Sequence, residues 1–396
     1  MYRKFKASAL FDGEGFVAGN PVLLTDMDGV VTAIVNDSDA GTDVEILEGI
    51  LCPGFINAHC HVELSHLKHR IAKGAGLVQF VQEVMANREA STSVKQAAMI
   101  NAEAEMLNSG IVAVGDICNT TDSIHVKKTS ALHWHNFIEV SGFVDATATK
   151  RLAEAQTVYA SYVDVFPGGD NFITPHAPYS VGAALFSLIN NLPGNNTISI
   201  HNQEAAAENE WYQYKTGDFE MLYDHLGITT DHFKPTGNTS VQSWRPFFNK
   251  SQQIIAVHNS FTSEADMAFL ADWQLQHPQE KPLVFCICAN ANKYIENTMP
   301  PLPVLMKHKA QIVVGTDSLA SNTVLNILEE LKTISAAFPD IPLATLLKWS
   351  TLNGASALSI NGIYGSFAAG TKPGIVLIEN TETDKLSMGA TSRRVL

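Results

Sequence analysis

The amino-acid sequence predicts an α/β protein: a (β/α)8 TIM barrel with a small β-sandwich domain formed from the N- and C-terminal segments. Eight short runs rich in β-branched residues recur along the chain, and helix-like stretches separate them, which is typical of a (β/α)8 barrel. Both ends of the chain instead contain strand-like runs with little helical pattern, and these predict the small β-domain. Eight alternations also fit a doubly wound sheet, and counting alone does not separate the two architectures.

The N-terminal segment is expected to contribute hairpin strands to the small domain. Its runs VLLTDMDGVVTAIV and TDVEILEG combine strand-forming residues with turn residues. The last part of the chain, KPGIVLIENTETDKLSMGATSRRVL, also has the pattern of strands. We therefore expect residues 1–53 and 360–396 to pair into the small β-domain, and residues 54–359 to form the barrel domain.

The eight predicted barrel strands are mostly continuous apolar runs, as expected of strands that are buried on both faces of a sheet. They cover residues 54–61, 110–118, 134–142, 171–180, 196–204, 253–261, 282–292 and 310–318. Between the first two, residues 77–110 have a long helical pattern that stops at Gly110. Residues 324–338 show a similar apolar stripe.

Length, charge and cysteine content restrict the class of protein. The 396 residues suffice for one barrel-sized domain and a smaller one. The net charge of −14 argues against nucleic acid or an anionic membrane surface as a partner. The N-terminus lacks the apolar stretch of a signal peptide, no apolar run is long enough to cross a bilayer, and the five cysteines form no CxxC pair. A cytoplasmic protein with reduced thiols is expected.

Histidines and carboxylates lie at the ends of the predicted strands, where a (β/α)8 barrel builds its active site. His59 and His61 are two residues apart, so both imidazoles would project from the same face of a strand. The other candidates at strand ends are His176, His201, Glu204, His258 and Asp317. One histidine at a strand end commonly caps a backbone carbonyl, but together these side chains would face the same barrel mouth.

These residue types indicate a metal site that activates water. Three imidazoles and one carboxylate form a suitable shell for Zn²⁺ or Fe²⁺, with one position left for water. Such a metal lowers the pKa of its bound water toward neutrality. Deamination or amide cleavage also needs a proton donor for the leaving nitrogen or its ring neighbour. Glu204 is the candidate donor, whereas Glu208 or Glu210 is expected to be a solvated glutamate.

Five motifs occur along the chain in a fixed order: PGFINAHCH, TPHAPYSV, IHNQE, VHNSF and GTDSLASN, from Pro53 to Asn322. They resemble the motifs of the amidohydrolase superfamily, specifically its mononuclear deaminase and chlorohydrolase-like branch. The later run GTKPGIVLIEN resembles the point at which that family returns to its β-domain. The resemblance therefore covers almost the whole chain.

The resemblance implies metal ligation by His59, His61, His201 and Asp317. It implies one divalent ion, because dinuclear members carry a carboxylated lysine on the fourth strand and residues 171–180 contain no lysine. Zn²⁺ is favoured over Fe²⁺ as that ion.

The resemblance also implies roles for the neighbouring groups. Glu204 would be the proton shuttle, and His258 would polarise the reacting carbon beside the metal-bound water. Asp317 would accept a proton from the attacking water, and His176 resembles a substrate-binding histidine of nucleoside-type deaminases.

The implied activity is a metal-dependent aminohydrolase that deaminates a purine, a purine nucleoside or a related aminated heterocycle by attack of metal-bound hydroxide, with release of ammonia. The runs HCHVELSHL, SIHNQE and YIENTMPPL resemble the group related to aminodeoxyfutalosine deaminases. An alternative is hydrolysis of another leaving group on the same site, such as halide, an alkylamine or a cyclic amide. A remote alternative is a catalytically silent metal-binding barrel.

Further candidates for substrate contacts lie in the loops. Glu63 follows the histidine pair, and Trp244 and Arg245 lie in a predicted substrate-covering loop, residues 233–248. Asn292 ends the segment that reads C-P-x-S-N in many relatives and Cys-Ala-Asn-Ala-Asn here.

Cys286 and Cys288 are expected to pack in the core rather than to bind metal. A small-molecule substrate is the expected partner, and analogy with relatives allows a homodimer.

Overall fold

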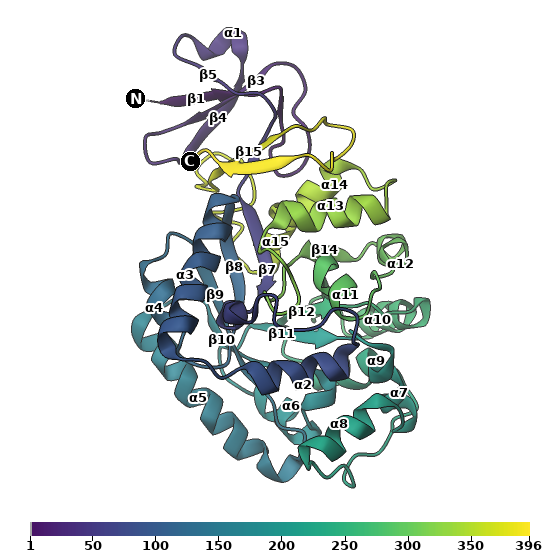
Figure 1. The fold of residues 1–396 in the computed structure, drawn as a ribbon. Coiled ribbons are helices and arrows are strands. Elements are labelled where there is room, and N and C mark those ends of the chain that lie inside the picture. Colours follow the sequence, from purple (N-terminus) through teal and green to yellow (C-terminus); the bar gives the residue numbers. More distant parts are fainter. Residues whose placement is uncertain (1) are drawn as a thin grey trace.

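The computed structural model describes residues 2–396 as an α/β protein in which parallel strands alternate with helices (Figure 1). Each of the eight runs predicted as barrel strands contains a strand. These are β7 (Phe55–Cys60), β8 (Ile111–Cys118), β9 (His133–Val140), β10 (Asn171–Pro175), β11 (Thr197–Asn202), β12 (Gln253–His258), β13 (Val284–Ile287) and β14 (Gln311–Val314). The prediction of eight strands in the central part of the chain is confirmed.

The eight strands pair in parallel and in chain order. One sheet holds β7, β8, β9 and β10, and a second holds β11, β12, β13 and β14. The sheets meet at both edges: a parallel bridge joins Cys60 to Asp317, and His201 N donates a hydrogen bond to His176 O (3.0 Å). All residues of β7 and β8 are buried, as the continuous apolar runs predicted.

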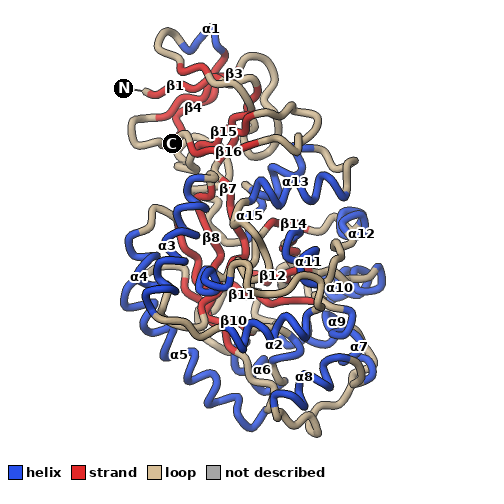
Figure 2. Tube along the Cα trace, viewed as in Figure 1, coloured by secondary structure: helices blue, strands red, loops and turns tan. Residues whose placement is uncertain are grey.

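Helices follow the strands along the chain and surround them (Figure 2). They are α2 (Leu77–Asn87), α3 (Thr92–Asn108), α4 (Ile124–Thr129), α5 (Ala148–Val165), α6 (Ala183–Asn190), α7 (Ala206–Tyr214), α8 (Asp218–Leu226), α9 (Ser240–Trp244), α10 (Glu264–Gln276), α11 (Ala289–Ile295), α12 (Leu302–Lys307), α13 (Ile327–Ala337), α14 (Leu343–Ser350) and α15 (Leu352–Ala357).

The single helical stretch predicted over residues 77–110 is two helices, α2 and α3. α2 ends at Asn87, and Ser91 adopts an extended conformation (φ −61°, ψ 148°) directly before α3 begins. Gly110 follows α3 with φ +99°, a backbone that favours glycine, and a Cβ there would approach Val376 to 2.5 Å. The predicted stop at Gly110 is therefore confirmed, whereas the break within the stretch is a correction.

The two ends of the chain form two further sheets, and both ends contribute strands to one of them. One sheet contains β1 (Arg3–Lys6), β3 (Pro21–Thr25), β4 (Val31–Asn36) and β5 (Glu45–Ile46), and α1 (Asp37–Ala40) precedes β5. The other contains β2 (Ala9–Leu10), β6 (Ile50–Pro53), β15 (Ile375–Glu379) and β16 (Thr391–Arg394). Because β15 pairs antiparallel with β6, the predicted pairing of the chain ends is confirmed.

The N-terminal hairpin prediction holds for β3 and β4, which pair antiparallel, but not for residues 42–49. There β5 pairs in parallel with β1. The reason is that α1 and the residues after it carry the chain across the sheet before β5 begins, which a tight hairpin turn would not do.

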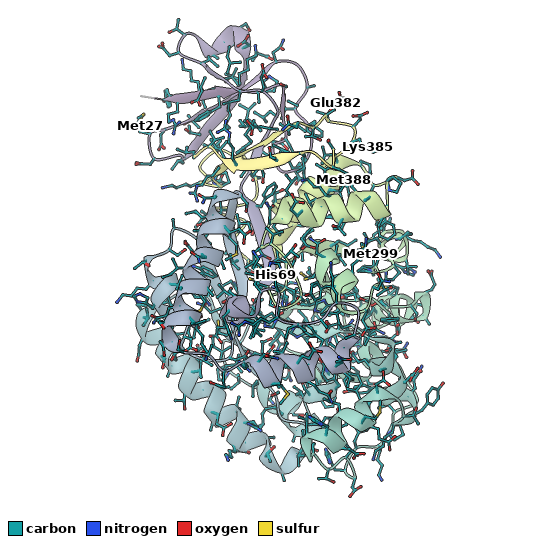
Figure 3. The ribbon with its side chains drawn as sticks, in the orientation of Figure 1. Met27, His69, Met299, Glu382, Lys385 and Met388 are labelled. Carbon is teal, nitrogen blue, oxygen red and sulfur yellow. The ribbon has the colours of Figure 1, made fainter. Side chains whose placement is uncertain are left out.

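Glu382, Lys385 and Met388 lie exposed on the loop between β15 and β16 (Figure 3).

The described residues, 2–396, contain no helix whose length and apolar character would let it cross a bilayer. All five cysteines are buried and unpaired, including Cys286 in β13 and Cys288 directly after it. This agrees with the predicted packing role.

His135 is a histidine inside the core of the parallel strands. Its side chain is 1% exposed, and the ring stacks on Phe172 with 4.9 Å between ring centroids. Neither ring nitrogen has a hydrogen-bond partner within the described chain. Burial lowers the pKa of His135 from 6.5 to about 3, so the folded protein holds this imidazole neutral while the unfolded chain protonates it.

We expect His135→Phe to reduce the loss in the free energy of unfolding that occurs as the pH falls below 7. A histidine whose pKa is lowered by folding costs stability as the pH falls from 6.5 toward about 3, because the unfolded state then binds more protons. Between pH 7.5 and pH 5 this amounts to about 2 kcal/mol, which the variant should lack. Urea unfolding at both pH values measures it, with exposed His225→Phe as control; equal pH dependence in all three proteins would contradict the assignment.

Candidate active site

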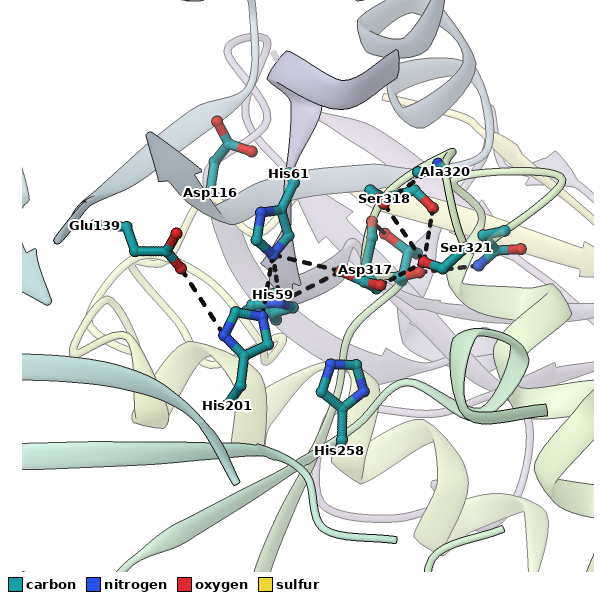
Figure 4. A network of polar contacts seen from close by, with 12 residues as sticks. His59, His61, Asp116, Glu139, His201, His258, Asp317, Ser318, Ala320 and Ser321 are labelled. Atoms are coloured by element: carbon teal, nitrogen blue, oxygen red, sulfur yellow. Dashed lines mark hydrogen bonds and ion pairs between the residues drawn. The ribbon is translucent and has the colours of Figure 1, made fainter. Parts of the chain in front are cut away.

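Four side chains from three strand ends converge at one edge of the parallel strands (Figure 4). His59 lies in β7 and His61 directly follows it, His201 lies in β11, and Asp317 follows β14. His61 Nε2 is 3.1 Å from His59 Nε2 and 3.2 Å from His201 Nε2. Asp317 Oδ1 lies 3.6 Å from His59 Nε2 and 3.4 Å from His61 Nε2. The predicted ligand set is therefore brought together.

The spacing of these atoms fits a small divalent cation. Zn–N bonds of about 2.0–2.1 Å in a tetrahedron place neighbouring ligand atoms roughly 3.3 Å apart. The single Nε2 of His61 carries at most one hydrogen, so it cannot donate to both neighbouring imidazoles. Burial lowers the pKa of His61 to about 4 and also lowers the pKa of His201. Both rings are thus neutral at pH 7, as metal ligands must be.

The tautomer of His201 is set by its neighbour. His201 Nδ1 lies 2.8 Å from the carbonyl oxygen of His176, and a carbonyl can only accept. The hydrogen therefore resides on Nδ1, and the lone pair on Nε2 points into the cluster. This is the arrangement by which a second contact orients a histidine ligand.

Asp317 is held as a carboxylate. Burial alone would raise its pKa, but the imidazoles of His59, His61 and His258 that face the carboxylate lower it. Ser321 Oγ donates to Asp317 Oδ2, which leaves Oδ1 directed toward His59 and His61.

A network of buried amides and one carboxylate supports the loop that carries Asp317. Asn57 and Thr316 exchange two hydrogen bonds, of 2.8 and 3.0 Å. Asn322 Nδ2 donates to Thr316 O (2.9 Å) and to Glu330 Oε1 (2.7 Å). Glu330 Oε2 accepts from Asn290 N (2.9 Å), so one side chain of α13 joins the first turn of α11 to the loop after β14. Asn57 and Glu330 were not predicted from the sequence, because neither stands at a strand end.

Glu204 and His258 face each other beside the cluster. His258 Nε2 lies 3.5 Å from Glu204 Oε1, and both side chains are buried. His258 Nδ1 donates to Asn292 Oδ1 (2.7 Å), so its Nε2 lone pair faces Glu204. Burial lowers the pKa of His258. Burial, followed by the charges of Asp317 and Glu296, raises the pKa of Glu204 well above its ordinary value.

The backbone at this edge adopts the left-handed conformation at several residues other than glycine. Values of φ are +46° at Gln203, +73° at His258, +59° at Asn259 and +56° at Asp317. Each such residue costs about 1–2 kcal/mol relative to ordinary backbone. Strain of this kind gathers at functional sites, where it aims side chains that regular strands cannot present.

One cavity of about 520 Å³ adjoins the cluster and lies within the usual size range of small-ligand sites. His61, His201, Glu204, His258 and Asp317 line it, together with the predicted substrate contact His176. Apolar side chains from α2 and α8 line another part of the wall: Leu77, Phe80, Val81, Val84, Met85, Leu222 and Leu226.

Trp244 and Arg245 do not line this cavity, which corrects their predicted role as substrate contacts. Trp244 is fully buried, and its Nε1 donates to Asn202 Oδ1 (2.8 Å). Arg245 is 2% exposed and forms a 2.6 Å ion pair with Glu280. Because their polar groups are satisfied inside the protein, these residues anchor the 233–248 segment.

Glu63 and Asn292 also have structural partners instead of lining the cavity. The Glu63 carboxylate accepts hydrogen bonds from the backbone N–H groups of Asn119 and Thr120. Asn292 accepts from His258 Nδ1 and donates to His258 O (3.2 Å). Glu63 therefore holds the loop after β8, and Asn292 orients His258.

Charged residues within two strands were missed by the sequence analysis. Asp116 in β8 forms a fully buried 2.6 Å ion pair with Lys127 and accepts from Val62 N, next to His61 (2.8 Å). Glu139 in β9 lines the cavity. The positions of Asp116 and Glu139 within apolar runs could have indicated these roles, because a carboxylate inside such a run is exceptional unless it is paired or functional.

Comparison with known proteins supplies relatives of similar length. The adenosine deaminase of Helicobacter pylori is 27% identical over 321 residues, which is 79% of this chain and 75% of that protein. The structure of Helicobacter pylori aminofutalosine deaminase in complex with methylthio-coformycin has a TM-score of 0.83 at 22% identity and covers 100% of both chains. A Xanthomonas campestris adenosine deaminase with bound zinc has a TM-score of 0.70 at 21% identity, covering 98% of this chain and 86% of that one.

The family assignment rests on the sequence itself. Residues 50–394 match the model of the amidohydrolase family, from β6 to the last strand. The chain belongs to the amidohydrolase family.

Proposed function

We propose that this protein is a metal-dependent aminohydrolase that removes the amino group of a purine nucleoside and releases ammonia. The observation that carries the proposal is the juxtaposition of a four-ligand cluster with Glu204 and His258 in one cavity. The names of the relatives support the substrate class, since they are adenosine and aminofutalosine deaminases.

His59, His61, His201 and Asp317 would hold one divalent ion, for which three imidazoles and a carboxylate favour Zn²⁺ over Fe²⁺. The zinc bound by the Xanthomonas relative supports this choice. When bound, such an ion lowers the pKa of a coordinated water toward neutrality.

Glu204 would supply the proton that the reaction needs. Burial raises the pKa of Glu204, which favours its protonated form. A protonated carboxyl group facing the cavity can donate to a ring nitrogen next to the reacting carbon, which makes that carbon more electrophilic. The subsequent loss of ammonia needs a proton on the leaving nitrogen, and Glu204 would shuttle to it a proton taken from the attacking oxygen.

His258 and Asp317 would act on the attacking oxygen. His258 is held neutral by burial, with Nε2 toward the cavity, where it can bind and orient the oxygen. Asp317 keeps its charge and can accept a proton from the attacking water. His176, which lines the same cavity, would contact the substrate.

We also propose that β7 to β14 close into a (β/α)8 barrel over residues 54–359. The parallel chain order of the strands and their contacts at both sheet edges support it. Residues 1–53 and 360–396 would form the small β-sandwich domain. A homodimer and a cytoplasmic location stay predictions.

The direct test of the function is ammonia release. The zinc-loaded protein should release ammonia from adenosine or 5′-deoxyadenosine, but no chloride or alkylamine from substituted triazines. Removal of metal with a chelator should abolish turnover and zinc should restore it, with one zinc per chain by plasma mass spectrometry. Chloride or amine release without deamination would instead favour the alternative leaving groups.

Glu204→Gln should lower turnover without changing metal binding. The amide cannot donate the required proton, so kcat should fall by about 10²–10⁴, while zinc content stays at the wild-type value. Exposed Glu210→Gln carries the same substitution on α7 and should retain activity. Wild-type turnover by Glu204→Gln would refute the proposed shuttle.

Glu330→Ala should loosen the loop that carries Asp317. The substitution leaves buried N–H groups of Asn290 and Asn322 without acceptors, so the free energy of unfolding should fall by about 2–4 kcal/mol and zinc should dissociate faster. Glu329→Ala, its half-exposed neighbour on α13, is the matched control: it removes an ion pair with Lys332 but no contact to either asparagine, so it should lower stability less and leave zinc release unchanged. Urea unfolding and zinc transfer to a chromogenic chelator measure both effects; similar results for both variants would contradict the bracing role.

A further inference from the structure

Glu139 presents an unsatisfied carboxylate oxygen inside the cavity. It lies near the end of β9, and its side chain is 7% exposed. Asn119 Nδ2 donates to Glu139 Oε1 (2.8 Å) and fixes one half of the carboxylate. The other oxygen, Oε2, is buried and has no hydrogen-bond partner within residues 2–396. A buried acceptor without a donor costs about 1–3 kcal/mol, and more when it is charged.

A second cation would not satisfy this oxygen. Glu139, His176 and His201 do lie close enough together to suggest a cation site. However, His201 Nδ1 donates its hydrogen to His176 O (2.8 Å), so it has no lone pair to offer a metal there. The same nitrogen lies 3.8 Å from Glu139 Oε2, too far for a hydrogen bond. Because Glu139 lines the cavity, a molecule bound there can supply the missing donor.

Glu139 lies on the far side of His201 from the reacting groups. Figure 4 shows Glu139 and His258 on opposite sides of the His201 ring, and Glu204 faces His258 at 3.5 Å. Glu139 and Glu204 nevertheless line the same cavity of about 520 Å³. A ligand whose reacting carbon lies beside Glu204 would therefore extend its other end toward Glu139.

The chemistry of a purine nucleoside identifies the donor. With the amino-bearing edge at the metal cluster, the remaining ring nitrogens of the base are acceptors. A carboxylate is acceptor-only, so it cannot pair with them. The hydrogen-bond donors that remain on the substrate are the sugar hydroxyls.

We propose that Glu139 is a specificity-determining residue that accepts a hydrogen bond from a sugar hydroxyl of the substrate. This proposal rests on the proposed function, which supplies the nucleoside. It goes further in assigning recognition of the sugar to a residue that takes no part in the chemical step.

Glu139→Gln tests the proposal sharply. The amide oxygen should stay on Asn119 Nδ2, so that an NH₂ group replaces the acceptor that faces the cavity. We expect kcat/KM for adenosine to fall by at least about tenfold, with little change for whichever of 2′-deoxyadenosine and 3′-deoxyadenosine lacks the contacted hydroxyl. The wild-type preference for the ribonucleoside should thereby collapse to within about threefold.

Controls separate this role from general effects. Glu382→Gln removes the same charge on the distant β15–β16 loop (Figure 3) and should keep the preference. Zinc content of Glu139→Gln should match that of the wild type; a lower content would assign the carboxylate to a cation site and overturn the proposal. Retention of the wild-type preference by Glu139→Gln would also overturn it.

A binding measurement makes the result independent of turnover. Calorimetry with purine riboside, which has no amino group to lose, should show tighter binding than its 2′-deoxy or 3′-deoxy analogue, and Glu139→Gln should remove the difference. Equal binding of all three by the wild type would overturn the role of Glu139 even if adenosine is deaminated. A wild type that discriminates among them but releases no ammonia would support Glu139 and refute the deaminase instead.

Discussion

The parallel register of β7, β11 and β14 is the constraint on which the site depends. Three imidazoles and one carboxylate, from residues far apart in the sequence, must bring one atom each within 4.8 Å of one another. Side chains alternate between the faces of a strand, so a slip of one residue in any of the three would turn its ligand away. The bridge between Cys60 and Asp317 ties the first and last of these strands together directly beside the ligands.

Burial has two opposite consequences around this cluster. It keeps His61 and His201 neutral, which prepares them to bind a cation. It also makes unpaired charge expensive, so the supporting carboxylates all have partners: Asp116 pairs with Lys127, and Glu330 accepts from two asparagines. Glu139 Oε2 departs from this rule while lining the cavity, and for that reason it points to a ligand.

The sequence allowed the central strands and the ligand set to be predicted, because both follow local rules. An apolar run with a histidine or an aspartate at its end predicts a buried strand and a polar residue at one edge of the sheet. Side-chain direction in loops follows no such rule. Trp244, Arg245 and Glu63 have the chemistry of substrate contacts, yet buried partners elsewhere satisfy them. The break between α2 and α3 and the parallel pairing of β5 depend on tertiary packing, which composition does not report.

Glu204 and Asp317 are both carboxyl groups, and their different surroundings give them the different roles of acid and base. Glu204 and Asp317 line one cavity, but the imidazoles of His59, His61 and His258 face Asp317 and lower its pKa. Glu204 lacks such compensation, and the neighbouring charge of Asp317 adds to the effect of burial, so its pKa rises. Two acids whose pKa values are driven apart in this way serve as base and acid at the same pH. The charge on Asp317 therefore helps to keep the proton on Glu204, and the ligand cluster and the proton donor form one electrostatic unit.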